Sequence, residues 1–286
     1  MQTAADSGSA TDLAEGRYRA LVAHLRAQAP LVVAFSGGVD SAFLLAAAVD
    51  AAPGQVRAIL GVSPSLSAES HAMARAVAAQ IGVALEEVST PEMESAAYVA
   101  NAGDRCFHCK NTLYSVMGTL ARAAEGERML DGTNADDLGD HRPGRRAAAL
   151  HGVESPLAEL GWSKEEIRAQ SRRLGLPTWD RPASPCLSSR IPVGIPVTVE
   201  ALRAIEAMES GLKRLGFPVV RARHHGGTAR VEVPLGDLER LEALRGKVEQ
   251  LARDSGYDGV ALDPEGYRVG GAGRVAPAEG QGRKKE

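Results

Sequence analysis

The chain has 286 residues, 44 % of them hydrophobic, and a net charge of −3, with its Lys and Arg residues dispersed along the sequence. It is long enough for one or two hydrophobic cores, and the dispersed cations predict no broad nucleic-acid surface. No apolar run approaches the roughly 18 residues of a membrane span, and residues 1–12 lack the basic and apolar regions of a signal peptide, so we expect a cytoplasmic protein without membrane or nucleic-acid partners.

The predicted elements divide the chain into two domains between irregular ends. Alternating strands and helices over residues 13–194 predict an α/β domain with a parallel sheet. Residues 195–269 follow a helix–hairpin–helix–strand order, which predicts a smaller α+β domain. Residues 1–12 and 270–286 are polar or Gly-rich and are predicted to be disordered. In chain order, the expected strands are 31–35, 56–62, 85–90, 128–131, 218–224, 229–233 and one near Val260, and the expected helices are 39–52, 68–81, 163–174, 199–215 and 235–255.

The turn between the first strand and the first helix of this set carries the most informative motif. Its two glycines let the backbone turn sharply and bring N–H groups close to an anion. The following helix adds four unpaired N–H groups and the positive end of its dipole. The serine hydroxyls are donors, and the aspartate is suited to a cation that accompanies a polyphosphate. A simple corner does not require this combination, so the sequence predicts a nucleotide site formed by Ser36, Gly37, Gly38, Val39, Asp40 and Ser41.

This motif differs from the common P-loop, in which a Lys reaches the outer phosphates. No Lys occurs between Met1 and Lys110, so that lysine is missing here. The motif instead resembles, at every position, the PP-loop of the ATP pyrophosphatases. The resemblance implies an adenine nucleotide alpha hydrolase-like fold. It also implies that ATP is cut between its α and β phosphates, which leaves AMP on a substrate oxygen and releases pyrophosphate.

The chain has three cysteines, which lie at two places in the sequence. Cys106 and Cys109 are separated by two residues, a spacing that lets both thiolates reach one metal, whereas Cys186 is distant. Four interpretations are open: small buried hydrophobic residues, a zinc site with His108, a redox dithiol, and an iron–sulfur site. The dithiol is disfavoured because the pair is not expected to open a helix, and zinc because His108 lies between the two cysteines. An iron–sulfur site with three cysteine ligands is favoured, since one iron then stays open for an extra sulfide.

Taken in order, these motifs resemble the LarE family of ATP-dependent sulfur transferases over residues 31–262. The matching segments are the PP-loop and residues 105–110, 132–137, 182–190 and 220–224. In that family a cysteine at the place of Cys186 handles sulfur. Some members resemble a sacrificial design, in which this residue becomes dehydroalanine, and others carry a [4Fe-4S] cluster on three cysteines. Because the additional pair is present, the chain resembles the cluster type, with Cys106, Cys109 and Cys186 as the implied ligands.

Two arginines near the end of the resemblance fit an anionic substrate. Arg221 and Arg223 alternate along a predicted strand, so their side chains project to the same face, and paired guanidinium groups bind phosphate bidentately. The residues alone leave open a solvated strand edge. With the resemblance, these arginines and Arg190 become candidates for binding the substrate phosphate, and Glu232 on the paired strand is expected to orient them.

The resemblance implies an enzyme that adenylates the carboxylates of pyridinium-3,5-biscarboxylic acid mononucleotide and converts them to thiocarboxylates for the nickel-pincer nucleotide cofactor. Its implied cofactors are ATP, Mg²⁺ and the [4Fe-4S] cluster, and Asp40 and Cys186 are its implied catalytic residues. Asp136 or Asp137 is either a magnesium ligand or a helix cap. The family also implies a homo-oligomer, with a hexamer as one form. The alternatives are the sacrificial use of Cys186, a PP-loop tRNA thiolase, an amidating ligase and an ATP sensor without turnover.

Overall fold

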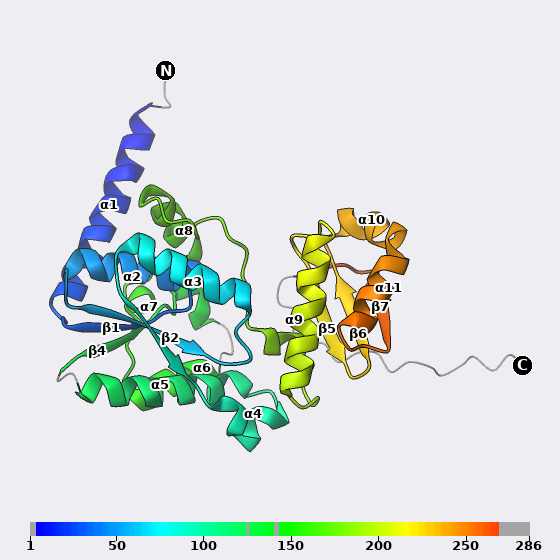
Figure 1. Cartoon of the computed structure of the whole chain (residues 1–286). Helices are drawn as coiled ribbons and strands as arrows, with labels where there is room; N and C mark the ends of the chain where they lie inside the picture. The colour runs from blue at the N-terminus through cyan, green and yellow to red at the C-terminus, as the bar shows by residue number, and fades with distance from the viewer. Residues whose placement is uncertain (1–3, 124–125, 140–142, 269–286) are drawn as a thin grey trace, which may run out of the picture. The chain divides into compact units, whose positions relative to one another are not determined.

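The computed structural model describes residues 4–123, 126–139 and 143–268 (Figure 1). The described chain forms two compact units. The first contains the residues up to Tyr98 and Asp104–Pro185, and the second contains Val99–Gly103 and the residues from Cys186 onward. The sequence placed the boundary at residue 194 and assigned residues 99–103 to the first domain. The segment predicted as a disordered tail, 270–286, lies outside the described residues.

The first unit is built on a four-stranded parallel sheet, which confirms the predicted α/β class. The strand order is β3-β2-β1-β4, so the first strand in sequence lies inside the sheet. Its register aligns Leu31 with Val56 on one side and with Arg128 on the other. The strands are β1 (Leu31–Ala34), β2 (Val56–Val62), β3 (Leu85–Ser89) and β4 (Arg128–Asp131).

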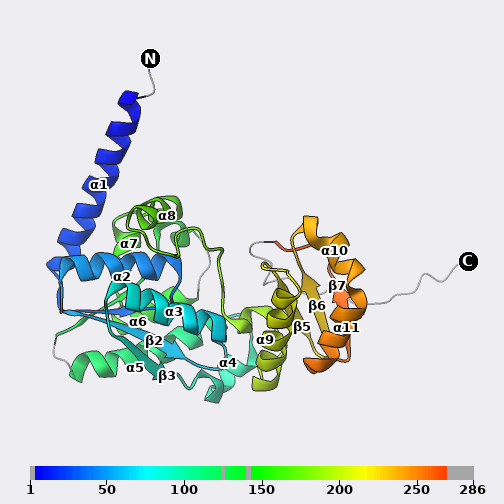
Figure 2. The ribbon, with the colours of Figure 1, turned by 45° about the horizontal axis from the view of Figure 1, so that its top comes forward.

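Helices cover both faces of this sheet (Figures 1 and 2). Alternate residues of β1 point to opposite faces, so Val33 packs with one group of helices and Val32 with the other. Because both faces are buried, the strand reads as a continuous apolar run rather than an alternating one. One face carries α2 (Val39–Ala51) and α3 (Ala68–Ile81), and the other carries α5 (Arg105–Ala123) and α6 (Gly144–His151).

Further helices of the first unit add to the core on the α2 side of the sheet. Helix α1 (Ala4–Arg26) begins within residues 1–12, for which the sequence predicted no regular structure. Its buried Leu21 and Leu25 belong to the core on the α2 side of the sheet. The unit also contains α7 (Pro156–Glu159) and α8 (Lys164–Arg173), and the boundary between the units falls within α4 (Ala96–Ala100). Helix α8, within the predicted range 163–174, starts at a capping box, in which Ser163 accepts from the Glu166 N–H and Glu166 accepts from the Ser163 N–H.

The second unit is a small α+β fold. Strands β5 (Arg221–His225) and β6 (Thr228–Glu232) form an antiparallel hairpin, and β7 (Gly259–Leu262) pairs with β6 in parallel. Helix α9 (Val199–Arg214) buries Met208 and Leu212 in the core of this unit. The helix predicted over 235–255 is divided into a 3₁₀ turn, α10 (Leu238–Ala243) and α11 (Arg245–Asp254). The break lies at Leu244, whose φ of −100° and ψ of 12° leave the helical region.

The short segment Val99–Gly103 joins this second unit through backbone and side-chain hydrogen bonds. The Asn101 amide donates to the carbonyl oxygens of Pro192, at 2.7 Å, and Ile195, at 2.9 Å. The Gly194 N–H donates to the Asn101 carbonyl at 3.0 Å. This contact ties the loop after Cys186 to a segment almost ninety residues earlier. The sequence did not predict this contact, because its side-chain hydrogen bonds come from one buried Asn, which forms no recognisable pattern.

Among the residues that the structure describes, no helix has both the length and the hydrophobicity needed to span a membrane.

Candidate functional site

The predicted nucleotide loop lies between β1 and α2, as expected. Gly37 has a φ of +71°, and a Cβ at this position would lie 2.8 Å from the Ala74 Cα, so both conformation and space require glycine. The Ser36 N–H donates to the Ser41 Oγ at 3.2 Å, and the two serine hydroxyls lie 3.1 Å apart. The end of β4 also approaches this loop closely, since a Cβ on Gly132 would meet the Ser41 nitrogen at 2.9 Å. The loop is therefore a closed turn braced by its own hydroxyls.

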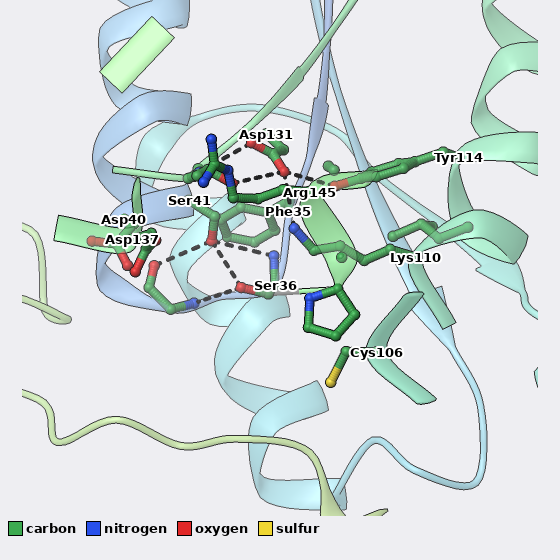
Figure 3. A pocket seen from close by; sticks show the side chains of 17 residues that line it. Phe35, Ser36, Asp40, Ser41, Cys106, Lys110, Tyr114, Asp131, Asp137 and Arg145 are labelled. Carbon is green, nitrogen blue, oxygen red and sulfur yellow. Dashed lines mark hydrogen bonds and ion pairs between the residues drawn. The ribbon is translucent and has the colours of Figure 1, made fainter. Parts of the chain in front are cut away.

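A pocket of about 560 Å³ opens over this loop within the first unit (Figure 3). Its volume lies in the range of small-molecule sites, roughly 300–1,000 Å³. The loop forms its floor, the end of β4 adds Gly132 and Thr133, and α5 and α6 form a further wall. The labelled side chains that line it are Phe35, Ser36, Asp40, Ser41, Cys106, Lys110, Tyr114, Asp131, Asp137 and Arg145.

Asp131, the last residue of β4, is the centre of a hydrogen-bond network at this pocket. Its carboxylate accepts from the Lys110 ammonium at 3.0 Å and the Tyr114 hydroxyl at 2.7 Å. It also accepts from the Ser155 hydroxyl at 2.8 Å, and from the Thr133 N–H at 3.1 Å and hydroxyl at 3.0 Å. Burial pushes the Asp131 pKa upward, but the Lys110 charge and the hydrogen bonds outweigh it and lower that pKa to about 2. Asp131 is thus a fixed anion.

Asp40 lies in the first turn of α2, and its carboxylate forms an ion pair with the first residue of α8. The Lys164 ammonium donates to Asp40 Oδ2 at 2.5 Å. The other oxygen, Oδ1, is buried and has no hydrogen-bond partner among the described residues. An orphaned carboxylate oxygen fits a cation ligand, since Mg²⁺ takes oxygen donors. Asp40 therefore has the chemistry expected of a residue that serves a metal–polyphosphate complex.

The two aspartates after Gly132 act as helix caps in this structure. Asn134 and Asp137 form a capping box, in which Asp137 accepts from the Asn134 N–H at 3.2 Å. Asp136 accepts from the Lys164 N–H at 2.8 Å, so it caps the start of α8. Of the two roles left open by the sequence, capping is the one that these hydrogen bonds support. Asp137 also lines the pocket.

The cysteine pair lies at the start of α5, which corrects the expectation that it does not open a helix. Cys106 and Cys109 are in the first turn, with Cys106 exposed and Cys109 half-buried. Asp104, a residue type favoured at N-caps, directly precedes α5, but the helix was missed because the burial of its apolar side, at Tyr114 and Met117, depends on the sheet. Cys106 lines the pocket above the nucleotide loop. A thiol of the predicted pair is therefore a wall residue of the predicted nucleotide site.

Cys186 belongs to the second unit, where it immediately precedes the 3₁₀ turn Leu187–Arg190 and is exposed. Within the described residues, no group of three or more His, Cys, Asp or Glu side chains is gathered closely enough to hold a metal ion.

The arginines predicted to bind substrate lie in the second unit, and two of them hold carboxylates. Arg190 donates to both Glu209 oxygens, at 2.8 and 3.0 Å, and Arg223 donates to both Glu232 oxygens at 2.9 Å. Arg190 also donates to the Cys186 carbonyl at 3.1 Å, and Arg223 donates to the Ser189 carbonyl at 3.0 Å. The expected Glu232 contact is therefore present. The sequence did not predict that both guanidinium groups also hold the backbone of the turn that follows Cys186.

Arg221 lies two residues before Arg223 on β5, and its environment differs. Its guanidinium stacks over the Tyr267 ring, 5.1 Å from the centroid, and donates to the Val220 carbonyl at 2.8 Å. Burial, followed by repulsion from the Arg190 charge, lowers the Arg221 pKa from its ordinary value. Lowering the pKa of a guanidinium means that its positive charge is held at some free-energy cost. An anion beside Arg221 relieves that cost.

The model of one protein family, asparagine synthase, matches residues 13–175. An uncharacterised protein of Synechocystis sp. is 44 % identical over 246 residues, which are 85 % of this chain and 92 % of that protein. The pyridinium-3,5-bisthiocarboxylic acid mononucleotide synthase of Lactiplantibacillus plantarum is 32 % identical over 251 residues, which are 87 % of this chain and 91 % of the synthase. The chain belongs to the LarE family of PP-loop proteins. An uncharacterised protein of Methanocaldococcus jannaschii is 25 % identical over 238 residues.

Membership in the LarE family confirms the resemblance inferred from the motifs and identifies the chain as an ATP-dependent sulfurtransferase. The pocket over residues 36–41 is its candidate nucleotide site. Sequence reasoning located the loop of this site but missed the side chains opposite it. It assigned no role at this site to Lys110, Lys164 or Asp131. The available signal for Asp131 was a carboxylate that ends a buried strand, a frequent position for site residues in parallel sheets.

Proposed function

We propose that the chain is a LarE-type sulfur transferase that adenylates the carboxylates of pyridinium-3,5-biscarboxylic acid mononucleotide and converts them to thiocarboxylates. The observation that carries this proposal is the 32 % identity to a synthase of the bisthiocarboxylic acid mononucleotide across 91 % of that enzyme. The PP-loop pocket supports it, because the phosphate-binding features and a cysteine line the same space.

The reaction begins with ATP and Mg²⁺ at the PP-loop. A substrate carboxylate attacks the α-phosphorus, the bond to the β-phosphate oxygen breaks, and pyrophosphate leaves. The product is an acyl-adenylate, in which AMP is a better leaving group than the original oxygen. Asp40 supplies the cation ligand, and its buried, partnerless Oδ1 is the atom that supports this role. Backbone N–H groups of the loop and the α2 terminus face the polyphosphate.

A sulfur nucleophile then attacks the activated carbonyl carbon, and AMP departs with the bonding electron pair. We assign the sulfur-handling residues as Cys106, Cys109 and Cys186. Their donor chemistry fits a [4Fe-4S] cluster, because three thiols that are exposed or half-exposed leave one iron without a protein ligand. When bound, such a cluster supplies the sulfide.

The substrate phosphate is assigned to the arginines of the second unit. Arg221 supports this assignment best, because its charge is buried and is repelled by Arg190. The backbone at Cys186 and in the turn that follows it accepts hydrogen bonds from Arg190 and Arg223, and Glu232 accepts from Arg223. These contacts connect the proposed phosphate-binding residues to the proposed sulfur-handling cysteine. The proposal also includes the cytoplasmic location and homo-oligomeric assembly of the family; light scattering of the purified protein measures the second.

The test is an anaerobic assay of the full chain with ATP, Mg²⁺ and each candidate acceptor supplied separately. We expect pyrophosphate and AMP in equal amounts with the pyridinium mononucleotide, and none with tRNA or free nucleosides. Mass spectrometry of the spent protein separates the two sulfur sources. An unchanged Cys186 with iron bound supports the cluster, whereas dehydroalanine at Cys186 in proportion to turnover indicates the sacrificial mechanism. Formation of ADP and phosphate would contradict the adenylation.

A further inference from the structure

The pocket contains a lysine whose place in the reaction has not been assigned. Lys110 extends from the second turn of α5 into the space lined by Ser36 and Ser41 (Figure 3). Its ammonium makes one hydrogen bond to another described residue, to Asp131 at 3.0 Å. It also lies 5.7 Å from the centroid of the Tyr114 ring. A protonated lysine has three N–H donors, so two remain for a ligand in the pocket.

The ion pair with Asp131 does not by itself explain this lysine. Asp131 accepts four other hydrogen bonds, from Tyr114, Ser155 and the backbone and hydroxyl of Thr133. Only 4 % of the Asp131 side chain is exposed, whereas 38 % of the Lys110 side chain is. The carboxylate is thus satisfied and buried, and the cation is placed at the open side of the pair. Such an arrangement fixes a positive charge at the surface of the pocket.

A fixed cation at this position complements what the loop itself lacks. The PP-loop contains no lysine, and between Met1 and Lys110 the chain has none. Lys110 comes from a different element yet faces the same floor of Ser36, Gly38 and Ser41. Arg145, from α6, lines the same wall and adds a second positive group. Positive charge opposite a helix N-terminus is suited to the most negatively charged part of a nucleotide, its outer phosphates.

We propose that Lys110 binds the β,γ-phosphates of ATP and stabilises them as they leave as pyrophosphate, and that Asp131 is the residue that positions its ammonium. This inference rests on the proposed use of ATP. It assigns to a residue of α5 the contact that the P-loop makes with a lysine of the loop itself.

The structure offers a steric way to displace Lys110 without changing its charge. Gly144, at the start of α6, lies against the lysine stem, and a Cβ at Gly144 would be 2.6 Å from Lys110 Cδ. Gly144→Ala therefore pushes the flexible stem aside while every charge is kept. Lys110→Met removes the charge, Lys110→Arg keeps it, and Lys247→Met is the matched control on an exposed lysine of α11 in the second unit.

Binding of ATP, pyrophosphate and AMP, each with Mg²⁺, is measured by calorimetry on the full chain. For Lys110→Met we expect ATP and pyrophosphate affinity to fall about tenfold to a hundredfold, the size of one lost charge-assisted hydrogen bond, with AMP affinity unchanged. Gly144→Ala should show a smaller loss with the same pattern, Lys110→Arg should recover part of it, and Lys247→Met should match the wild type.

The outcomes separate this inference from the proposed function. If the wild type binds no ATP, the proposed function fails. If the wild type binds ATP and Lys110→Met and Gly144→Ala both bind it equally well, the lysine is a structural ion pair and the inference is wrong. An equal loss of ATP and AMP affinity also overturns it, because the contact is then at the α-phosphate. If Lys110→Met does not fold, Gly144→Ala and Lys110→Arg decide.

Discussion

The two units place positive charge in opposite ways. In the second unit, Arg190 and Arg223 are buried and each is matched by a carboxylate that accepts two hydrogen bonds. In the first unit, Lys110 and Lys164 each make a single carboxylate contact and keep about a third of their side chains exposed. Buried, fully paired cations hold backbone in place, whereas half-exposed cations with open donors are available to a ligand. We therefore expect the first kind to govern stability and the second to govern ligand binding.

The largest effect is expected in the second unit, from Glu209→Ala. This change removes the partner of a buried guanidinium and the acceptor of the Ala222 N–H, which donates to Glu209 at 3.1 Å. An unpaired buried charge costs about 3–5 kcal/mol, so denaturant unfolding should show a loss of that size. Glu242→Ala, which breaks the exposed pair with Arg245, is the control and should be silent. A loss as small as that of the control would show that Arg190 does not depend on Glu209.

In the first unit, the largest effect is expected on turnover rather than on stability. Asp40→Ala removes the carboxylate whose Oδ1 has no partner, and pyrophosphate release should fall about 10²–10³-fold, the usual cost of one electrostatic group at a reacting centre. The melting temperature should change little. Asp50→Ala, at the other end of α2, is the matched control, since Asp50 accepts only from Tyr18 in a contact away from the loop. Equal activity in the two variants would remove Asp40 from the mechanism.

A smaller effect on stability is expected from Asp131, a buried carboxylate that supports the fold and also binds the ammonium of Lys110. Its pKa of about 2 lies below the usual value, so the carboxylate stabilises the fold above about pH 4, and this stabilisation is lost as the pH falls toward 2. The contribution is about 2 kcal/mol. Urea unfolding of the wild type and Asp131→Asn should differ by at least this amount at pH 7, and the difference should shrink toward pH 2. A gap independent of pH would mean that the charge of Asp131 is not what stabilises the fold.

The sequence allowed prediction of the features that depend on neighbouring residues. The PP-loop, the parallel strands around it, the helix that follows Ser163 and the hairpin of the second unit all follow from local spacing and from glycine chemistry. The contacts that complete the site join residues far apart in the chain. Lys164 reaches Asp40 across 124 positions, and Ser155 reaches Asp131 across 24. A single lysine or serine has no local pattern that identifies its partner.

The same limit explains the misread cysteine segment. Cys106 and Cys109 were considered as metal ligands, a redox dithiol or buried hydrophobic residues, but not as residues of a helix, because the burial of that helix is visible only against β1 and β2. Once α5 is known, its first two turns place Cys106 and Lys110 on one pocket wall. A change in the position of α5 is then expected to affect both the sulfur-handling cysteine and the phosphate-binding lysine. The cysteine motif and the PP-loop motif, taken separately, do not indicate this.

The smallest effect is expected from Lys164, whose ion pair with Asp40 is partly exposed on both sides. Such a pair contributes about 0.5–1 kcal/mol, so Lys164→Met should alter the free energy of unfolding only slightly. The same substitution, which slightly weakens the fold, should strengthen the binding of Mg²⁺. A magnesium ion at Asp40 Oδ1 shares the carboxylate with the Lys164 ammonium on Oδ2, and removing this competing positive charge should lower the Mg²⁺ concentration at half-maximal pyrophosphate release about two- to fivefold, the same free energy expressed as an affinity. Lys110→Met offers the contrast, because it removes a ligand of the phosphates and should raise that concentration. If Lys164→Met also raises it, Lys164 is a second phosphate ligand rather than a competitor of the metal, and Lys110 and Lys164 then serve the same part of ATP.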